Sequence, residues 1–197
     1  MGPFSAVVAQ DTAENYRNQK GVGAALKGLP RDSYFLTTKT VPCTAETEAA
    51  CTASTTKDFL GDLEDLGLEY VDLILLHGPS NRGGKCTKSA CAKDLGQWKA
   101  YEALYKAGKA KAIGVSNYCV SCYECLIGAP GVTVVPAVNQ IEFHAGMGPD
   151  PAGIVSYSEK HDIVVQAYSP LGNGQLISDN QLKTIGAKMT PPKSAAQ

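Results

Sequence analysis

Short apolar runs alternate with longer stretches of helical character along the chain, and this alternation constrains the fold more than any other feature. The runs are four to seven residues long and rich in β-branched side chains, which is typical of buried strands. They are AVVA (6–9), YFLTT (34–38), VDLILL (71–76), AIGV (112–115), VTVVPAV (132–138) and IVVQA (163–167). Short strands separated by helices form parallel sheets covered on both faces. The sequence therefore predicts an α/β protein built from successive strand–helix units.

Two of the intervening stretches carry apolar side chains at helical spacing. These predicted helices span 57–68 and 98–110. Their expected buried stripes are Phe59, Leu60, Leu63 and Leu66 in the first and Trp98, Tyr101, Leu104 and Tyr105 in the second. The segment 193–197 (KSAAQ) has the pattern of another helix start, and the Gly/Lys-rich segment 80–88 that of a loop. No linker divides the sequence, so we expect residues 1–197 to form a single domain.

Composition and charge exclude several classes of function. The formal net charge is −1, and no basic patch indicates binding to nucleic acid or to a membrane surface. No apolar run approaches the roughly 20 residues that a membrane-spanning helix needs. The N-terminal segment lacks the basic region of a signal peptide. These features favour a cytoplasmic location and a small-molecule partner.

The seven cysteines leave two readings open. An odd count is not typical of a disulfide scaffold, although Cys86 and Cys91 could pair under oxidation. Cys119, Cys122 and Cys125 have the spacing of an iron–sulfur run, but the fourth ligand position holds Ala129. Residues three apart share one helix face, so we expect these three to be small core residues. On this reading the chain has no metal site.

Polar residues follow the apolar runs, which points to one shared site. Each run is followed by at least one of them: Asp11, Lys39, His77, Ser116 with Asn117, Asn139 with Gln140, and Tyr168 with Ser169. Ligands bind at the carboxyl ends of parallel strands, where these side chains would form a ring. Tyr16 lies five residues after Asp11. A tyrosine donates a proton efficiently near neutral pH only where a cation, itself held by a carboxylate, stabilises the phenolate.

The same segments carry a family resemblance. DTAENY, TTK, LILLHGP, IGVSNY, VNQIEFH and AYSPLG resemble, in order and spacing, the aldo-keto reductase superfamily, as does the longer segment 98–117. The resemblance implies a (β/α)8 barrel, known as a TIM barrel. It also implies reduction of aldehydes or ketones to alcohols by hydride transfer from a nicotinamide cofactor, usually NADPH, which leaves as NADP+.

The resemblance also assigns roles to individual residues. Tyr16 would donate the proton, Lys39 would stabilise its phenolate, Asp11 would hold Lys39, and His77 would orient the carbonyl. Ser116, Asn117 and Gln140 would bind the nicotinamide carboxamide. Tyr168 would stack on the nicotinamide ring, and Ser169 and Leu171 would border the pyrophosphate.

Several features depart from the family pattern. Six strands are found rather than eight, and the first and eighth strands and the 2′-phosphate residues are not among them. Gly78 stands where many members have tryptophan, which removes an aromatic wall of the substrate pocket. We therefore expect an incomplete barrel whose exposed edges allow self-association, although family members are monomers. The alternatives are a non-catalytic, cofactor- or partner-binding relative on the same fold, and an iron–sulfur or metal protein.

Overall fold

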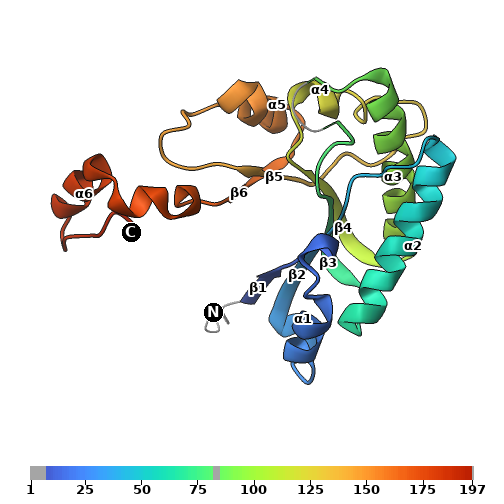
Figure 1. Ribbon diagram of the computed structural model, residues 1–197, viewed down its shortest axis with the longest axis horizontal. Helices are drawn as coiled ribbons and strands as arrows, with labels where there is room; N and C mark the ends of the chain where they lie inside the picture. The colour runs from blue at the N-terminus through green and yellow to red at the C-terminus, as the bar shows by residue number, and fades with distance from the viewer. Residues whose placement is uncertain (1–7, 82–84, 197) are drawn as a thin grey trace.

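Six strands form one parallel sheet in the computed structural model, which describes residues 8–81 and 85–196 (Figure 1). The strands are β1 (Val8–Asp11), β2 (Tyr34–Thr40), β3 (Val71–Leu76), β4 (Ala110–Ser116), β5 (Val138–Glu142) and β6 (Val164–Tyr168). Their order in the sheet is the order in the chain, and each neighbouring pair is parallel. The expected incomplete (β/α)8 barrel is confirmed. Positions 6 and 7 of the first predicted strand lie outside the described residues.

Helices connect the strands and cover the sheet. They are α1 (Gln19–Leu26), α2 (Glu48–Leu66), α3 (Lys88–Lys106), α4 (Val120–Tyr123), α5 (Ile154–Lys160) and α6 (Asn180–Ala187), with 3-10 turns η1 (Glu14–Tyr16), η2 (Arg31–Ser33), η3 (Pro151–Gly153) and η4 (Gly172–Ser178). Helices α2 and α3 lie side by side against the sheet, whereas η4 and α6 extend away from it (Figure 1). No helix in the described ranges is long and apolar enough to cross a membrane.

The two predicted helices begin earlier than their apolar stripes suggested. The side chains of Thr47 and Thr87 cap α2 and α3 by accepting the backbone N–H three residues on, each at 3.2 Å. Most of the stripe residues are buried in the core between these helices and strands β2 to β4. Leu60 and Tyr105 are exceptions, with exposed fractions of 39% and 41%. Leu60 is one position, and thus about 100°, from the buried Phe59.

The predicted strand at 132–138 is wrong except for its last residue. In this segment, side chains of α3 form hydrogen bonds with backbone groups that would pair with a neighbouring strand if the segment were a strand. Glu102 accepts the N–H groups of Thr133 and Val134 at 2.7 Å, and the Trp98 indole donates to the Val134 carbonyl at 3.0 Å. Pro136 has no N–H to give to a ladder. Strand pairing therefore starts only at Val138.

The predicted helix start at 193–197 is also wrong. Helix α6 ends at Ala187, and of the described residues 193–196 none is helical, with 195 and 196 in a turn. Pro191 and Pro192 precede this segment, and the Lys193 N–H folds back to donate to the Gly186 carbonyl at 2.9 Å. The two prolines stop α6 from continuing into this segment, and the Lys193 bond ties the segment back to the end of that helix.

The cysteines depart most from expectation. Three disulfides join Cys43 with Cys51, Cys86 with Cys122, and Cys91 with Cys125. Cys122 and Cys125 are buried, as expected, but each is a disulfide partner, and Cys86 and Cys91 do not pair with each other. The last two disulfides tie α3 and the residues just before it to α4 and the residues just after it. That pairing depends on how two segments about 35 positions apart pack, which spacing along the chain does not reveal.

Candidate active site

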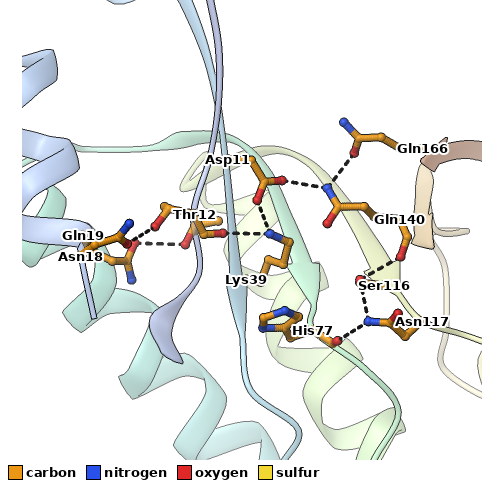
Figure 2. A network of polar contacts seen from close by, with 11 residues as sticks. Asp11, Thr12, Asn18, Gln19, Lys39, His77, Ser116, Asn117, Gln140 and Gln166 are labelled. Atoms are coloured by element: carbon orange, nitrogen blue, oxygen red, sulfur yellow. Dashed lines mark hydrogen bonds and ion pairs between the residues drawn. The ribbon is translucent and has the colours of Figure 1, made fainter. Parts of the chain in front are cut away.

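Lys39 is a buried charged group at the carboxyl end of the sheet, with 1% of its side chain exposed. It lies near the end of β2, and its ammonium forms an ion pair with the Asp11 carboxylate at the end of β1. The ammonium also donates to the Thr12 carbonyl at 3.1 Å (Figure 2). A buried ammonium is costly unless it is paired and hydrogen-bonded. These two partners therefore hold the lysine head group in a fixed position.

Tyr16 lies directly beside this lysine. It ends η1, and its ring centroid is 5.1 Å from the Lys39 ammonium nitrogen. The same ring meets His77 edge to face, with centroids 5.5 Å apart and planes at 76°. Glu14 anchors η1 to the sheet by accepting the Val41 N–H at 3.1 Å. The structure thus brings Asp11, Lys39, Tyr16 and His77 together at one end of the sheet.

His77 and Asn117 are linked across two strand ends. The His77 N–H donates to the Thr40 carbonyl at 2.9 Å, which continues the β2–β3 ladder by one residue. The Asn117 side-chain amide donates to the His77 carbonyl and to the Ser116 hydroxyl, both at 3.0 Å. Asn117 adopts a left-handed backbone conformation, with φ of 59°, which asparagine tolerates better than most residues. This conformation places its amide over the neighbouring strand.

Gln140 connects the far strands to the lysine pair. Its amide nitrogen donates to Asp11 Oδ2 at 2.7 Å and to Gln166 Oε1 at 3.1 Å (Figure 2). The sheet curves enough for β1 and β5 side chains to meet across its mouth. Gln166 is not among the site residues predicted from sequence, although a polar residue inside the apolar run 163–167 is a usable signal. The carbonyl of Thr12 is not among them either.

Tyr168, at the end of β6, reaches toward the Asn117 amide. Its hydroxyl donates to Asn117 Oδ1 at 2.8 Å. Partial burial, with smaller contributions from Glu142 and Tyr16, raises the pKa of Tyr168, so the hydroxyl keeps its proton. Ser169 lies beside the same site, and its hydroxyl donates to Asn173 at 3.0 Å. Leu171 lies further out, where it precedes η4.

Two cavities meet at these residues. The larger has a volume of about 1010 Å³ and extends toward Gly78, Cys119 and Glu124. The smaller, of about 560 Å³, extends toward Gln140, Gln166 and Ser169. Both are lined by the same four side chains: Tyr16, His77, Asn117 and Tyr168. The arrangement can hold one molecule on each side of a boundary at which a phenol, an imidazole and an amide are available.

Comparison with known proteins agrees with the fold. The profile of the Aldo/keto reductase family matches residues 7–196. Glycerol 2-dehydrogenase (NADP(+)) of Saccharomyces cerevisiae is 36% identical over 83% of this chain and 56% of its own length. Glyoxal reductase of Bacillus subtilis is 36% identical over 95% of this chain and 61% of its own. An aldo/keto reductase structure from Brucella melitensis superposes with a TM-score of 0.76 at 36% identity, covering 98% and 67% of the two chains.

The chain belongs to the aldo/keto reductase family. It spans little more than half the length of the two curated relatives named above.

Proposed function

We propose that this chain reduces aldehydes or ketones to alcohols, with Tyr16 as the proton donor and NADPH as the hydride source. One observation carries the proposal: Tyr16 and His77 line both cavities, so each can contact a molecule on either side. Reduction of a carbonyl requires a hydride donor and a proton donor to meet at the same C=O group. The boundary between the two cavities offers that geometry.

The residues of the smaller cavity fit a nicotinamide. Its carboxamide group needs hydrogen-bond donors and acceptors, and Ser116, Asn117 and Gln140 carry both kinds. The Gln140 nitrogen is used by Asp11 and Gln166, which fixes the rotation of this amide. Tyr168 supplies an aromatic ring on the same wall. NADPH, when bound, supplies the hydride, and Ser169 and Leu171 would border its pyrophosphate.

The protein's own residues handle the proton. Tyr16 would donate its phenolic proton to the carbonyl oxygen, and the adjacent Lys39 ammonium would stabilise the phenolate that remains. Asp11 and the Thr12 carbonyl hold the ammonium in place. His77, edge-on to the tyrosine ring, would orient and polarise the carbonyl. No group needs to travel far between these roles.

The larger cavity would take the carbonyl substrate. Gly78 at its wall leaves open space where a bulky side chain would narrow it. The names of the relatives include a glyoxal reductase and a glycerol dehydrogenase. We therefore propose a small, non-aromatic aldehyde or ketone as substrate. The partner is a small molecule rather than a nucleic acid or membrane.

Replacing Tyr16 with phenylalanine tests the proposal. The rate of aldehyde reduction should fall by at least about a hundredfold, because a general acid typically contributes 10²–10⁴. The dissociation constant for NADPH, followed by cofactor fluorescence, should change little. Tyr105→Phe is the matched control, since Tyr105 is an exposed tyrosine of α3. A Tyr16→Phe variant with near wild-type turnover would overturn the assignment.

The second candidate is a non-catalytic, cofactor- or partner-binding relative. In that case NADPH would bind with no turnover in wild type and no difference between wild type and Tyr16→Phe.

A cytoplasmic location and the single domain both stay predictions. The disulfides bear on location, because such bonds persist mainly in oxidising compartments. We also propose self-association through the outer strands β1 and β6. Its support is the exposure of Val8 and Val164 on these strands, at 56% and 61%.

A further inference from the structure

Three cysteine sulfurs lie together beside the larger cavity. Cys122 is bonded to Cys86, and the Sγ atom of Cys119 lies 3.0 Å from that of Cys122. All three sulfur atoms are within 4.8 Å of one another. Cys119 is outside the three disulfides. A thiol at this distance from a disulfide sulfur is close enough to attack it.

These sulfurs differ in access. Cys119 is half-buried and lines the larger cavity, and Cys86 is also half-buried. Cys122 is fully buried between them. A molecule entering from the cavity would therefore meet Cys119 or Cys86 before Cys122. The attack on Cys122 has to come from inside the protein, and Cys119 is the group placed to make it.

Ser121 holds the two chain segments in register. Its hydroxyl accepts the Cys86 N–H at 3.2 Å and lies 3.3 Å from the Cys119 sulfur. The loop residue Cys86 and the residue preceding α4 thus contact the same hydroxyl. This shared contact keeps Cys119 and Cys86 close to each other and to the buried Cys122 sulfur, as exchange of one disulfide partner for another requires.

We propose that Cys86, Cys119 and Cys122 form a thiol–disulfide exchange site that reacts with low-molecular-weight disulfides. In the first step the Cys119 thiolate attacks Sγ of Cys122. The Cys119–Cys122 bond forms, the Cys86–Cys122 bond breaks, and the electron pair leaves with Cys86 as a thiolate. This step changes no net oxidation state.

In the second step the Cys86 thiolate attacks a small disulfide, RSSR. A mixed disulfide forms on Cys86, and RS⁻ leaves, so the small disulfide supplies the oxidising equivalent. Lys85, the residue before Cys86, lines the larger cavity, so a group attached to Cys86 would lie near that cavity. A mixed disulfide on Cys86 would obstruct the entry of carbonyl substrates. This effect rests on the proposed function, whereas the exchange itself does not.

Disulfide mapping tests the exchange without measuring activity. The chain purified without reductant, with EDTA present, is incubated with oxidised glutathione. It is then quenched with acid, alkylated with N-ethylmaleimide, digested and analysed by mass spectrometry. We expect two disulfide isomers, Cys86–Cys122 and Cys119–Cys122, and glutathione attached to Cys86. Cys43–Cys51 is the internal control and should stay unchanged.

Two variants sharpen the test. Of the two disulfide isomers, the Cys119→Ser variant should show only Cys86–Cys122. It should carry no glutathione on Cys86. Ser178→Ala, which changes an exposed serine of η4 and keeps all three sulfurs, is the control and should still exchange. Near-ultraviolet circular dichroism checks that both fold, and Cys119→Ala replaces the serine variant if it does not. Wild-type protein that never shows the Cys119–Cys122 bond, or equal glutathione on Cys86 with and without Cys119, would overturn the proposal.

Discussion

The middle of the sheet and its β6 end differ in how firmly they are packed. Strands β2, β3 and β4 lie under α2 and α3, and Lys39 and Leu75 on them are almost fully buried. Strand β6 and helix α6 are exposed along much of their length, with Val164 at 61% and Ile185 at 59%. Lys39 and His77 therefore lie at the ends of packed strands, whereas Tyr168 lies at the end of an exposed one. Substitutions in the first should affect chemistry or folding, and those in the second should affect cofactor affinity.

The largest effect is expected for Lys39→Met. It removes the cation beside Tyr16 and leaves the Asp11 carboxylate without its buried partner. We expect carbonyl reduction to fall by about 10²–10⁴, the range of general acid–base catalysis. Steady-state kinetics on an aldehyde measures the loss. Lys183→Met on exposed α6 is the control and should leave the rate unchanged; an equal loss in both variants would remove the distinction between the regions.

Trp98→Ala should have the next largest effect, this time on stability. Trp98 is fully buried in α3, and its indole holds the segment before β5. Truncation of a buried tryptophan typically costs about 3–5 kcal/mol of unfolding free energy. Ile185→Ala on α6 should cost less than about 1 kcal/mol, because that side chain is mostly exposed. Urea unfolding of both variants compares the two regions directly. Equal costs would show that the exposed region is packed as tightly as the core.

Asp62 should make stability depend on pH. Burial in α2, together with the carboxylates of Glu14, Asp58 and Asp65, raises the pKa of Asp62 to about 7. The folded state therefore holds this proton more tightly than the unfolded state. The contribution of the Asp62 proton to the free energy of unfolding is fully present below the unfolded pKa of about 4. It is lost as pH rises through the folded pKa of about 7. The change should amount to a few kcal/mol at most.

Asp62→Asn should flatten this slope in urea unfolding series taken across that pH range. The control lies in the less packed part of the chain. Hydrogen bonds from Ser156 and Val155 lower the pKa of the fully exposed Asp150, so its contribution has the opposite sign and is lost only as pH falls through that pKa. Asp150→Asn should leave the slope between pH 4 and 7 intact. An unchanged slope in Asp62→Asn would remove Asp62 as its source.

Tyr168→Phe should have the smallest effect. It removes the hydrogen bond to Asn117 but keeps the ring on the cavity wall. A hydrogen bond of this kind contributes about 0.5–1.5 kcal/mol, so NADPH affinity should weaken by no more than about tenfold. Tyr168→Ala, which also removes the ring, should weaken it further. Fluorescence titration separates the two, and equal losses would mean that the ring does not contact the cofactor.

The sequence predicted most of the sheet because its signals are local. Strand order follows from short β-branched runs, and the position of Lys39 and His77 follows from where those runs end. It failed where a distant side chain took over the backbone. The strand predicted before Val138 is replaced by bonds to Glu102, which no local pattern reveals.

The site was predictable in part for the same reason. Asp11, Lys39 and His77 stand at strand ends, so periodicity places them together. Gln166 and the Thr12 carbonyl act through contacts across the sheet and were missed. The cysteine pairs depend on how α3 and α4 pack, so their spacing alone indicated the wrong partners.

Isotope transfer from the cofactor tests the central claim most directly. The purified chain is incubated with an aldehyde and NADPH deuterated at the transferable C4 position, and the alcohol is analysed by mass spectrometry. The account predicts deuterium on the carbinol carbon of the product with wild type, and at least about a hundredfold less labelled alcohol with Tyr16→Phe. Alcohol without deuterium, no alcohol from wild type, or equal labelling by both proteins would contradict it.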